Sequence, residues 1–140
     1  FKLLSDALNE NNQDVRSAAV SGLGELHIAD RSGIIDLLIK SLKDPSPVVR
    51  SSAARSLGYF ETDAEQAAPH LIKLLKDSDN SVRMLAVNSL EKVTRGGDYL
   101  AEVTEAVKNV SKNDPDKFVK NSAREILIKL NRRKKSHQGI

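Results

Sequence analysis

The chain has 140 residues and a formal net charge of +3, and 39% of its residues are hydrophobic while 29% are charged. This balance is typical of a soluble folded chain and excludes an intrinsically disordered one. The absence of cysteine excludes disulfides and thiolate metal sites, and it fits a cytoplasmic protein. Aromatic residues make up only 4% of the chain, which argues against a site built on aromatic stacking. No apolar run approaches the ~20 residues of a membrane-spanning helix, so we expect no membrane association.

Four helix pairs are predicted, because one short motif recurs along the chain. A Val-Arg pair stands at residues 15/16, 49/50 and 82/83 and returns as Val119-Lys120, with spacings of 34, 33 and 37 residues. A period in this range indicates an array of helical repeats. No segment alternates with a period of two, so we expect no strands.

The first helix of each pair is marked by an apolar stripe at helical spacing. In the first pair this helix is short, so we expect it to be N-terminally truncated and the chain to be part of a longer chain or assembly. In chain order the stripes are Phe1, Leu4 and Leu8; Ile34, Ile35, Leu38 and Leu42; Ala68, Leu71, Ile72 and Leu75; and Leu100, Val103, Val107 and Val110.

The second helix of each pair carries the recurring motif. When the Arg of the motif (or Lys120) is position 0, an apolar residue stands at −1, Ala at +3 and Leu at +7, which is one helical stripe. The small Ala in its middle lets a neighbouring helix approach closely. The stripes are Val15, Ala19 and Leu23; Val49, Ala53 and Leu57; Val82, Ala86 and Leu90; and Val119, Ala123 and Leu127.

Turn signals stand between these stripes. Ser46 followed by Pro47 is typical of an N-cap and a first helical residue, and Asp114-Pro115 can serve the same way. Thr62-Asp63-Ala64-Glu65 fits a capping box ahead of the third pair. Gly96-Gly97-Asp98 is expected to break one helix and cap the next.

The pattern Leu-x-x-Leu-Leu-Lys-Asp-x-x-x-x-Val-Arg-x-x-Ala-x-x-x-Leu resembles the HEAT repeat, and the short period is similar to that of phycobilisome lyases. The tetratricopeptide alternative needs large aromatics that this chain lacks, and an armadillo unit needs a third helix. The resemblance implies an all-α, right-handed superhelix. Its repeats are expected at residues 1–28, 29–61, 62–96 and 97–131, followed by a basic tail at 132–140.

The resemblance also implies a structural ladder, in which the turn aspartates pair with arginines of neighbouring repeats. Carried over to this chain, the ladder consists of Asp44, Asp77 and Asp114 with Arg16, Arg50, Arg83 and Lys120. Lysine lacks the planar fork of arginine, so the ladder should be weaker at the last position.

Catalytic, metal and cofactor sites are not expected. His27, His70 and His137 have no second ligand at metal-binding spacing, so the repeated His-Glu pairs of HEAT-like hydroxylases are missing. There is no nucleophile elbow and no glycine-rich phosphate loop. We therefore expect a non-enzyme without cofactors, with a lyase subunit as the alternative suggested by the repeat type.

The preferred function is a protein-interaction scaffold with an unidentified protein partner. In HEAT arrays the second helices line the concave face, and positions +1, +5 and +8 of the motif point toward it. The candidate binding surface consists of Ser17, Ser21, Ser51, Arg55, Met84, Asn88, Glu91, Asn121 and Glu125.

The runner-up function uses the basic C-terminal end. Residues 101–140 carry 10 basic and 5 acidic groups, and their net charge of +5 exceeds the +3 of the whole chain. Such a cluster can contact nucleic acid or an acidic partner, although a solvated, frayed terminus is the plainer interpretation. The candidate basic patch consists of Lys129, Arg132, Arg133, Lys134 and Lys135.

Overall fold

The fold is a row of antiparallel helix pairs, seen in a computed structural model that describes residues 1–26 and 31–139. Within these residues the secondary structure is entirely helical, and no strand occurs. The elements are α1 (Lys2–Ala7), α2 (Gln13–Glu25), α3 (Ser32–Ser41), α4 (Pro47–Tyr59), the 3₁₀ helix η1 (Glu61–Ala67), α5 (Ala68–Leu74), α6 (Asn80–Val93), α7 (Leu100–Asn113) and α8 (Lys117–Gln138).

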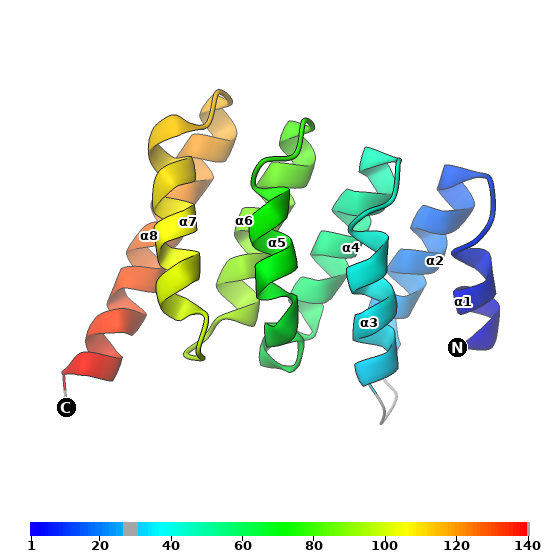
Figure 1. Cartoon of the computed structure of the whole chain (residues 1–140), viewed down its shortest axis with the longest axis horizontal. Coiled ribbons are helices and arrows are strands. Elements are labelled where there is room, and N and C mark those ends of the chain that lie inside the picture. The colour runs from blue at the N-terminus through cyan, green and yellow to red at the C-terminus, as the bar shows by residue number, and fades with distance from the viewer. Residues whose placement is uncertain (27–30, 140) are drawn as a thin grey trace.

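The helices form two layers, and the termini lie at opposite ends of the row (Figure 1). The first helices α1, α3, α5 and α7 form one layer, and the second helices α2, α4, α6 and α8 form the other. The second helices pack closely on one another in sequence, whereas α5 and α7 meet only briefly. Each pair contacts only its neighbours, which is the arrangement of a helical repeat array.

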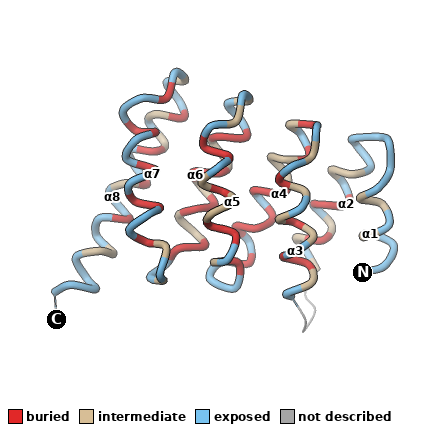
Figure 2. The backbone as a smooth tube through the Cα atoms, in the orientation of Figure 1, coloured by how far each residue is buried: buried red, intermediate tan, exposed pale blue. Residues whose placement is uncertain are grey.

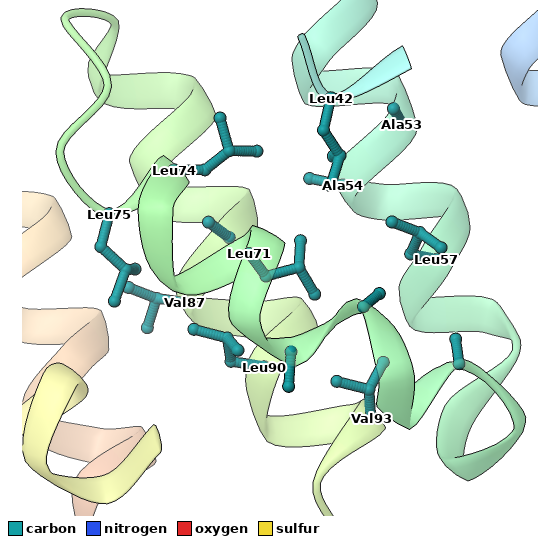
Figure 3. Packing of buried hydrophobic residues seen from close by; sticks show 14 of the residues in the cluster. Leu42, Ala53, Ala54, Leu57, Leu71, Leu74, Leu75, Val87, Leu90 and Val93 are labelled. Carbon is teal, nitrogen blue, oxygen red and sulfur yellow. The ribbon is translucent and has the colours of Figure 1, made fainter. Parts of the chain in front are cut away.

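The core lies between the two layers, as the buried segments in Figure 2 show. Leu23, Leu57 and Leu90 of the predicted stripe are fully buried, and the last two pack among the side chains drawn in Figure 3. The stripe is interrupted at both ends of the array. Val15 is 40% exposed, and Leu127 is only partly buried.

Glycine and serine allow the second helices to approach closely. A Cβ atom on Gly24 would lie 2.5 Å from Ser56 Oγ, and one on Gly58 would lie 3.0 Å from Ser89 Oγ. Both serines are buried and donate hydrogen bonds to backbone carbonyls of the preceding second helix: Ser56 to Val20 (3.3 Å) and Ser89 to Ala54 (2.6 Å).

The last interface between second helices is built differently. Glu91 stands where the earlier helices have Gly24 and Gly58, and Ile126 stands where the later ones have Ser56 and Ser89. Larger side chains therefore replace the small pair, and α6 and α8 are in close contact over a shorter stretch than α2 and α4 or α4 and α6.

Two predicted helix starts are wrong in detail. Thr62-Asp63-Ala64-Glu65 forms no capping box but lies in η1, and α5 begins only at Ala68. The Glu65 side chain instead packs closely against Gly97, where a Cβ atom would collide with it. At α8 the N-cap is Asp116, which accepts hydrogen bonds from the N–H groups of Phe118 and Val119, because Asp114 is used in another contact described below.

The other two turn signals also need adjustment. Ser46 occupies the N-cap position before Pro47, but its hydroxyl donates to Gln13 Oε1 (2.7 Å) instead of accepting from its own helix. The glycines at 96 and 97 do separate α6 from α7, yet Tyr99 rather than Asp98 is the residue that precedes α7.

The expected tail at 132–140 is not a frayed terminus, because α8 continues to Gln138. No helix breaker stands before Gly139, and the Arg133 side chain is fixed on α6. The fourth repeat therefore extends past residue 131. The predicted boundary at 28/29 and His27 lie outside the described residues.

Candidate functional site

Three arginine–aspartate pairs connect successive repeats. Arg16 pairs with Asp44 and Arg50 with Asp77, each through a 2.8 Å contact from Nε to Oδ2. Arg83 pairs with Asp114 at 2.9 Å, and in all three pairs Nη2 donates a second hydrogen bond to Oδ1. Each arginine thus binds the turn aspartate of the following repeat with two parallel hydrogen bonds.

The same arginines also hold their own turns. Nη1 of Arg50 donates to the backbone carbonyls of Asp44 (2.9 Å) and Pro45 (3.0 Å). Arg16 and Arg83 repeat this pattern with the carbonyls six and five residues before them. Arginine is suited to this role because its planar fork can bridge several oxygens at once.

Each ladder aspartate also accepts the N–H group two residues further on, which fixes the turn. The hydrogen bonds from Arg16 hold the pKa of Asp44 below its ordinary value. Burial on its own would raise the pKa of Asp77, but hydrogen bonds from Arg50 and from the Asp79 N–H outweigh it, and that pKa is also lowered. These groups are occupied with one another, as expected for contacts that hold successive repeats together.

Lys120, the last predicted member of the ladder, lies half-buried on α8. It makes no ion pair with any carboxylate of the described residues.

The second-helix face, defined as the open side of α4, α6 and α8, carries a hollow of about 420 Å³. Four residues of the predicted binding surface meet there: Arg55, Asn88, Glu91 and Glu125. They come from three successive repeats. Lys129 of the predicted basic patch lines the same hollow, so the structure joins two surfaces that the sequence treated separately.

Other lining residues were missed by the sequence analysis. Tyr59, Lys92 and Ser122 line the hollow, as do the apolar Leu85 and Ile126. Tyr59 and Lys92 each directly follow the residue at position +8 of the motif. The Lys92 ammonium lies 5.7 Å from the centre of the Tyr59 ring. Their repeat positions gave no signal, because the hollow depends on how α4 and α8 meet α6.

A second hollow of about 260 Å³ adjoins the first and shares Arg55 and Leu85 with it. It contains Met84 of the predicted surface and the exposed ring of Phe118. Asp116 lies at its edge, where it accepts a hydrogen bond from the Asn80 side chain (2.8 Å).

The remaining predicted surface residues lie outside these two hollows. Ser17 contacts Ser52 through their hydroxyl groups, and Ser51 donates to the Val48 carbonyl. Ser21 is exposed, and Asn121 accepts a hydrogen bond from Arg124. The two hollows therefore gather the predicted surface residues of the C-terminal half of the array.

The basic patch divides into three parts. Arg133 forms an ion pair with Glu91 and also donates to its backbone carbonyl (2.7 Å), so its charge is neutralised. Lys129 faces the hollow. Arg132 and Lys135 are exposed at the end of α8, and Lys134 is half-buried.

The two described histidines do not form a metal site. Burial, with the nearby charges of Lys73 and Lys43, lowers the pKa of His70. The His137 ring contacts the Arg133 carbonyl (2.9 Å). Over residues 1–26 and 31–139, no cluster of three or more His, Asp or Glu side chains is placed to hold a metal ion. In the same part of the chain, no helix is long and apolar enough to span a membrane.

Comparisons with known proteins agree with this architecture. The family model described as HEAT repeats matches residues 1–91 and 35–128. The bilin biosynthesis protein MpeU of Synechococcus sp. (strain WH8020) is 33% identical over 90 residues, which cover 64% of this chain and 30% of that protein. The chain thus aligns with less than a third of the length of this curated relative.

Solved structures show the same fold at low identity. The complex of CpcE and CpcF of phycocyanin lyase from Nostoc sp. PCC7120 matches with a TM-score of 0.76 and 23% identity, over 89% of this chain and 78% of that chain. A designed armadillo repeat protein matches with a TM-score of 0.67 and 18% identity, over 92% and 69% of the two chains. Together with the repeated motif and its ladder, the family match shows that this chain belongs to the HEAT-repeat family.

Proposed function

We propose that the chain is a non-catalytic scaffold that binds a partner protein through its second-helix face. The observation that carries this proposal is the convergence of Arg55, Asn88, Glu91 and Glu125, from three repeats, around one hollow of about 420 Å³. Extended surfaces of this kind are what repeat arrays use to bind partners. We place the protein in the cytoplasm, because a chain without cysteine suits a reducing compartment.

The surface has the character of a protein-binding groove rather than a reaction centre. Its side chains mix apolar, amide and charged groups across α4, α6 and α8, and the hollow is open along the face. The charged groups of the ladder, in contrast, are buried and mutually paired. The face therefore offers contacts of the kind that a partner protein uses.

A bulky substitution in the groove tests this proposal. Asn88→Trp should block the second-helix face, whereas Glu102→Trp adds the same bulk on the exposed surface of the first helix α7. Wild type and Glu102→Trp should crosslink the same partner in extracts of the source cells, and Asn88→Trp should lose it while keeping its circular dichroism spectrum. Equal crosslinking by all three proteins would show that the partner does not use this face.

A second candidate is a subunit that handles bilin pigments. The observations that favour it are the similarity to the bilin biosynthesis protein MpeU and the shared fold with the CpcE–CpcF complex of phycocyanin lyase. The chain should then bind a free bilin, with a change in the visible absorption spectrum. An unchanged spectrum across a titration, with and without an added HEAT-repeat partner subunit, would exclude this candidate.

A further inference from the structure

The two hollows of the second-helix face include the interface at which the small residues between successive second helices are replaced. Gly24 against Ser56 and Gly58 against Ser89 hold the earlier second helices close together. Glu91 and Ile126 replace these small residues between α6 and α8. The Glu91 carboxylate then turns to Arg133, and the space beside this ion pair is the larger hollow. The groove therefore spans α4, α6 and α8 and includes the interface that lacks the small glycine–serine pair.

Three carboxylates line this groove, and among the described residues a cation pairs with one of them. Glu91 forms an ion pair with Arg133. Asp116 caps α8 and accepts from Asn80, and hydrogen bonds from the Asn80 amide and the Val119 N–H lower the pKa of this carboxyl. Glu125 is the remaining acid and has no partner among the described residues.

The cations of the groove are not neutralised in this way. Arg55, Lys92 and Lys129 form no ion pair with any residue that the structure describes, and the Lys92 ammonium lies 5.7 Å from the centre of the Tyr59 ring. These three cations face two carboxylates without a cationic partner, Glu125 and Asp116. With Glu91 neutralised by Arg133, the groove therefore keeps a net charge of +1.

The adjoining hollow supplies apolar contacts. Met84, Leu85 and Phe118, which is 74% exposed, line this hollow. Methionine and an exposed aromatic ring provide an adaptable apolar surface of the kind that receives the side chains of a docked helix. The groove therefore has Met84 and Phe118 in one hollow and the two lysines in the other, and the two hollows share Arg55 and Leu85.

We propose that this groove binds an acidic amphipathic segment of the partner protein. The apolar side chains of this segment would pack on Met84, Leu85 and Phe118. The carboxylates of the segment would pair with Arg55, Lys92 and Lys129. The proposal rests on the scaffold function proposed above and names the chemistry of the partner. Complementary charge at an exposed groove mainly selects the partner and accelerates association.

A synthetic helical peptide with leucines on one face and glutamates on the other is the probe, with binding followed by fluorescence anisotropy. Matched peptides replace every glutamate by glutamine or by lysine. The intact chain should bind the glutamate peptide at least tenfold more tightly than the lysine peptide, and added salt should reduce this preference. Phe118→Ser should weaken binding of the glutamate peptide, because the substitution removes an apolar contact.

Charge reversal locates the binding site. Lys92→Glu/Lys129→Glu should reduce the affinity for the glutamate peptide by about tenfold or more. It should also reduce or invert the difference in affinity between the glutamate and lysine peptides. The control Lys40→Glu/Lys73→Glu makes the same change in net charge on the exposed surfaces of α3 and α5 and should have little effect. All variants should keep the helical content of wild type, because these lysines are not in the core.

Three results would overturn the proposal. The first is an equal loss of affinity for the glutamate peptide in both double variants. The second is equal affinity for the glutamate and lysine peptides. The third is binding of a single-stranded oligonucleotide as tightly as the glutamate peptide, which would mean that only charge matters. The scaffold function has its own separate test. If Asn88→Trp abolishes partner crosslinking while Lys92→Glu/Lys129→Glu leaves it unchanged, the scaffold stands and the acidic segment is excluded.

Discussion

The guanidinium of Arg83 and the carboxylate of Asp114 form the most buried contact of the ladder, with side-chain exposures of 10% and 3%. The hydrogen bonds between them raise the pKa of Arg83. In the same geometry, Arg83 holds the turn that begins at Asp77. One residue therefore joins the third repeat to the fourth and also closes its own turn.

Removal of Arg83 should be costly because it leaves Asp114 buried without a counter-charge. Arg83→Leu should lower the free energy of unfolding by about 3 kcal/mol. Arg95→Leu is the control, because the Arg95–Glu61 pair is about half exposed and its loss should cost less than about 1 kcal/mol. Urea unfolding of both variants measures the difference, and similar losses would contradict a structural role for the ladder.

The core stripe predicts a second contrast in stability. Leu57→Ala and Leu90→Ala should each cost on the order of 2–5 kcal/mol, since both side chains are fully buried. Leu3→Ala should cost less than about 0.5 kcal/mol, because Leu3 is 81% exposed. Denaturant melts of the three variants provide the measurement. Losses below about 0.5 kcal/mol for the buried pair would mean that the repeats do not share one core.

Two glycines should respond to alanine in opposite directions. A Cβ atom on Gly24 would meet Ser56 at 2.5 Å from Oγ and 3.2 Å from the backbone Cα, so Gly24→Ala should force α2 and α4 apart and cost about 1–3 kcal/mol. Nothing lies within 4 Å of a Cβ atom on Gly33. Gly33→Ala should therefore stabilise α3 by up to about 1 kcal/mol, and thermal melts would reveal the opposite signs.

The ladder should also make stability depend on acid. Because the pKa of Asp44 is lowered in the folded chain by the Arg16 hydrogen bonds, its contribution is complete above the ordinary value of 3.8. It is then lost as the pH falls below 3.8 through the lower folded value. The free energy of unfolding, measured by urea titration at a series of pH values, should decrease less steeply with falling pH in Asp44→Asn than in wild type. The control Asp36→Asn should follow wild type, because Asp36 is exposed and forms no ion pair with the residues that the structure describes.

Affinity for polyanions should depend mainly on the exposed cations at the end of α8. Arg132→Gln/Lys134→Gln/Lys135→Gln keeps Arg133 on Glu91, so it removes charge without releasing the helix. Weak, salt-dependent binding of duplex DNA should fall by about tenfold or more, because counterion release drives it. The control Lys40→Gln/Lys73→Gln/Lys112→Gln should bind as wild type does. Unchanged binding by the first variant would direct attention to the cations of the groove.

The helix pairs and their order can be predicted from the amino-acid pattern alone. Apolar residues at −1, +3 and +7 identify one buried stripe, and the 33- to 37-residue period places successive stripes side by side. The register in which Arg50 meets Asp77 follows from the same period once the HEAT resemblance is recognised. These features are readable because the contacts repeat, and each repeat meets its neighbour in nearly the same way.

The departures of the array from its own pattern became visible once the helices were placed in space. Glu91 and Ile126 both line the larger hollow and stand at positions where earlier repeats have glycine and serine, and the two residues are far apart in the sequence. Arg133 turns an expected tail into helix by reaching Glu91, 42 residues earlier. Local periodicity specifies helices and their buried faces, but the contacts between non-equivalent side chains depend on which surfaces packing brings together.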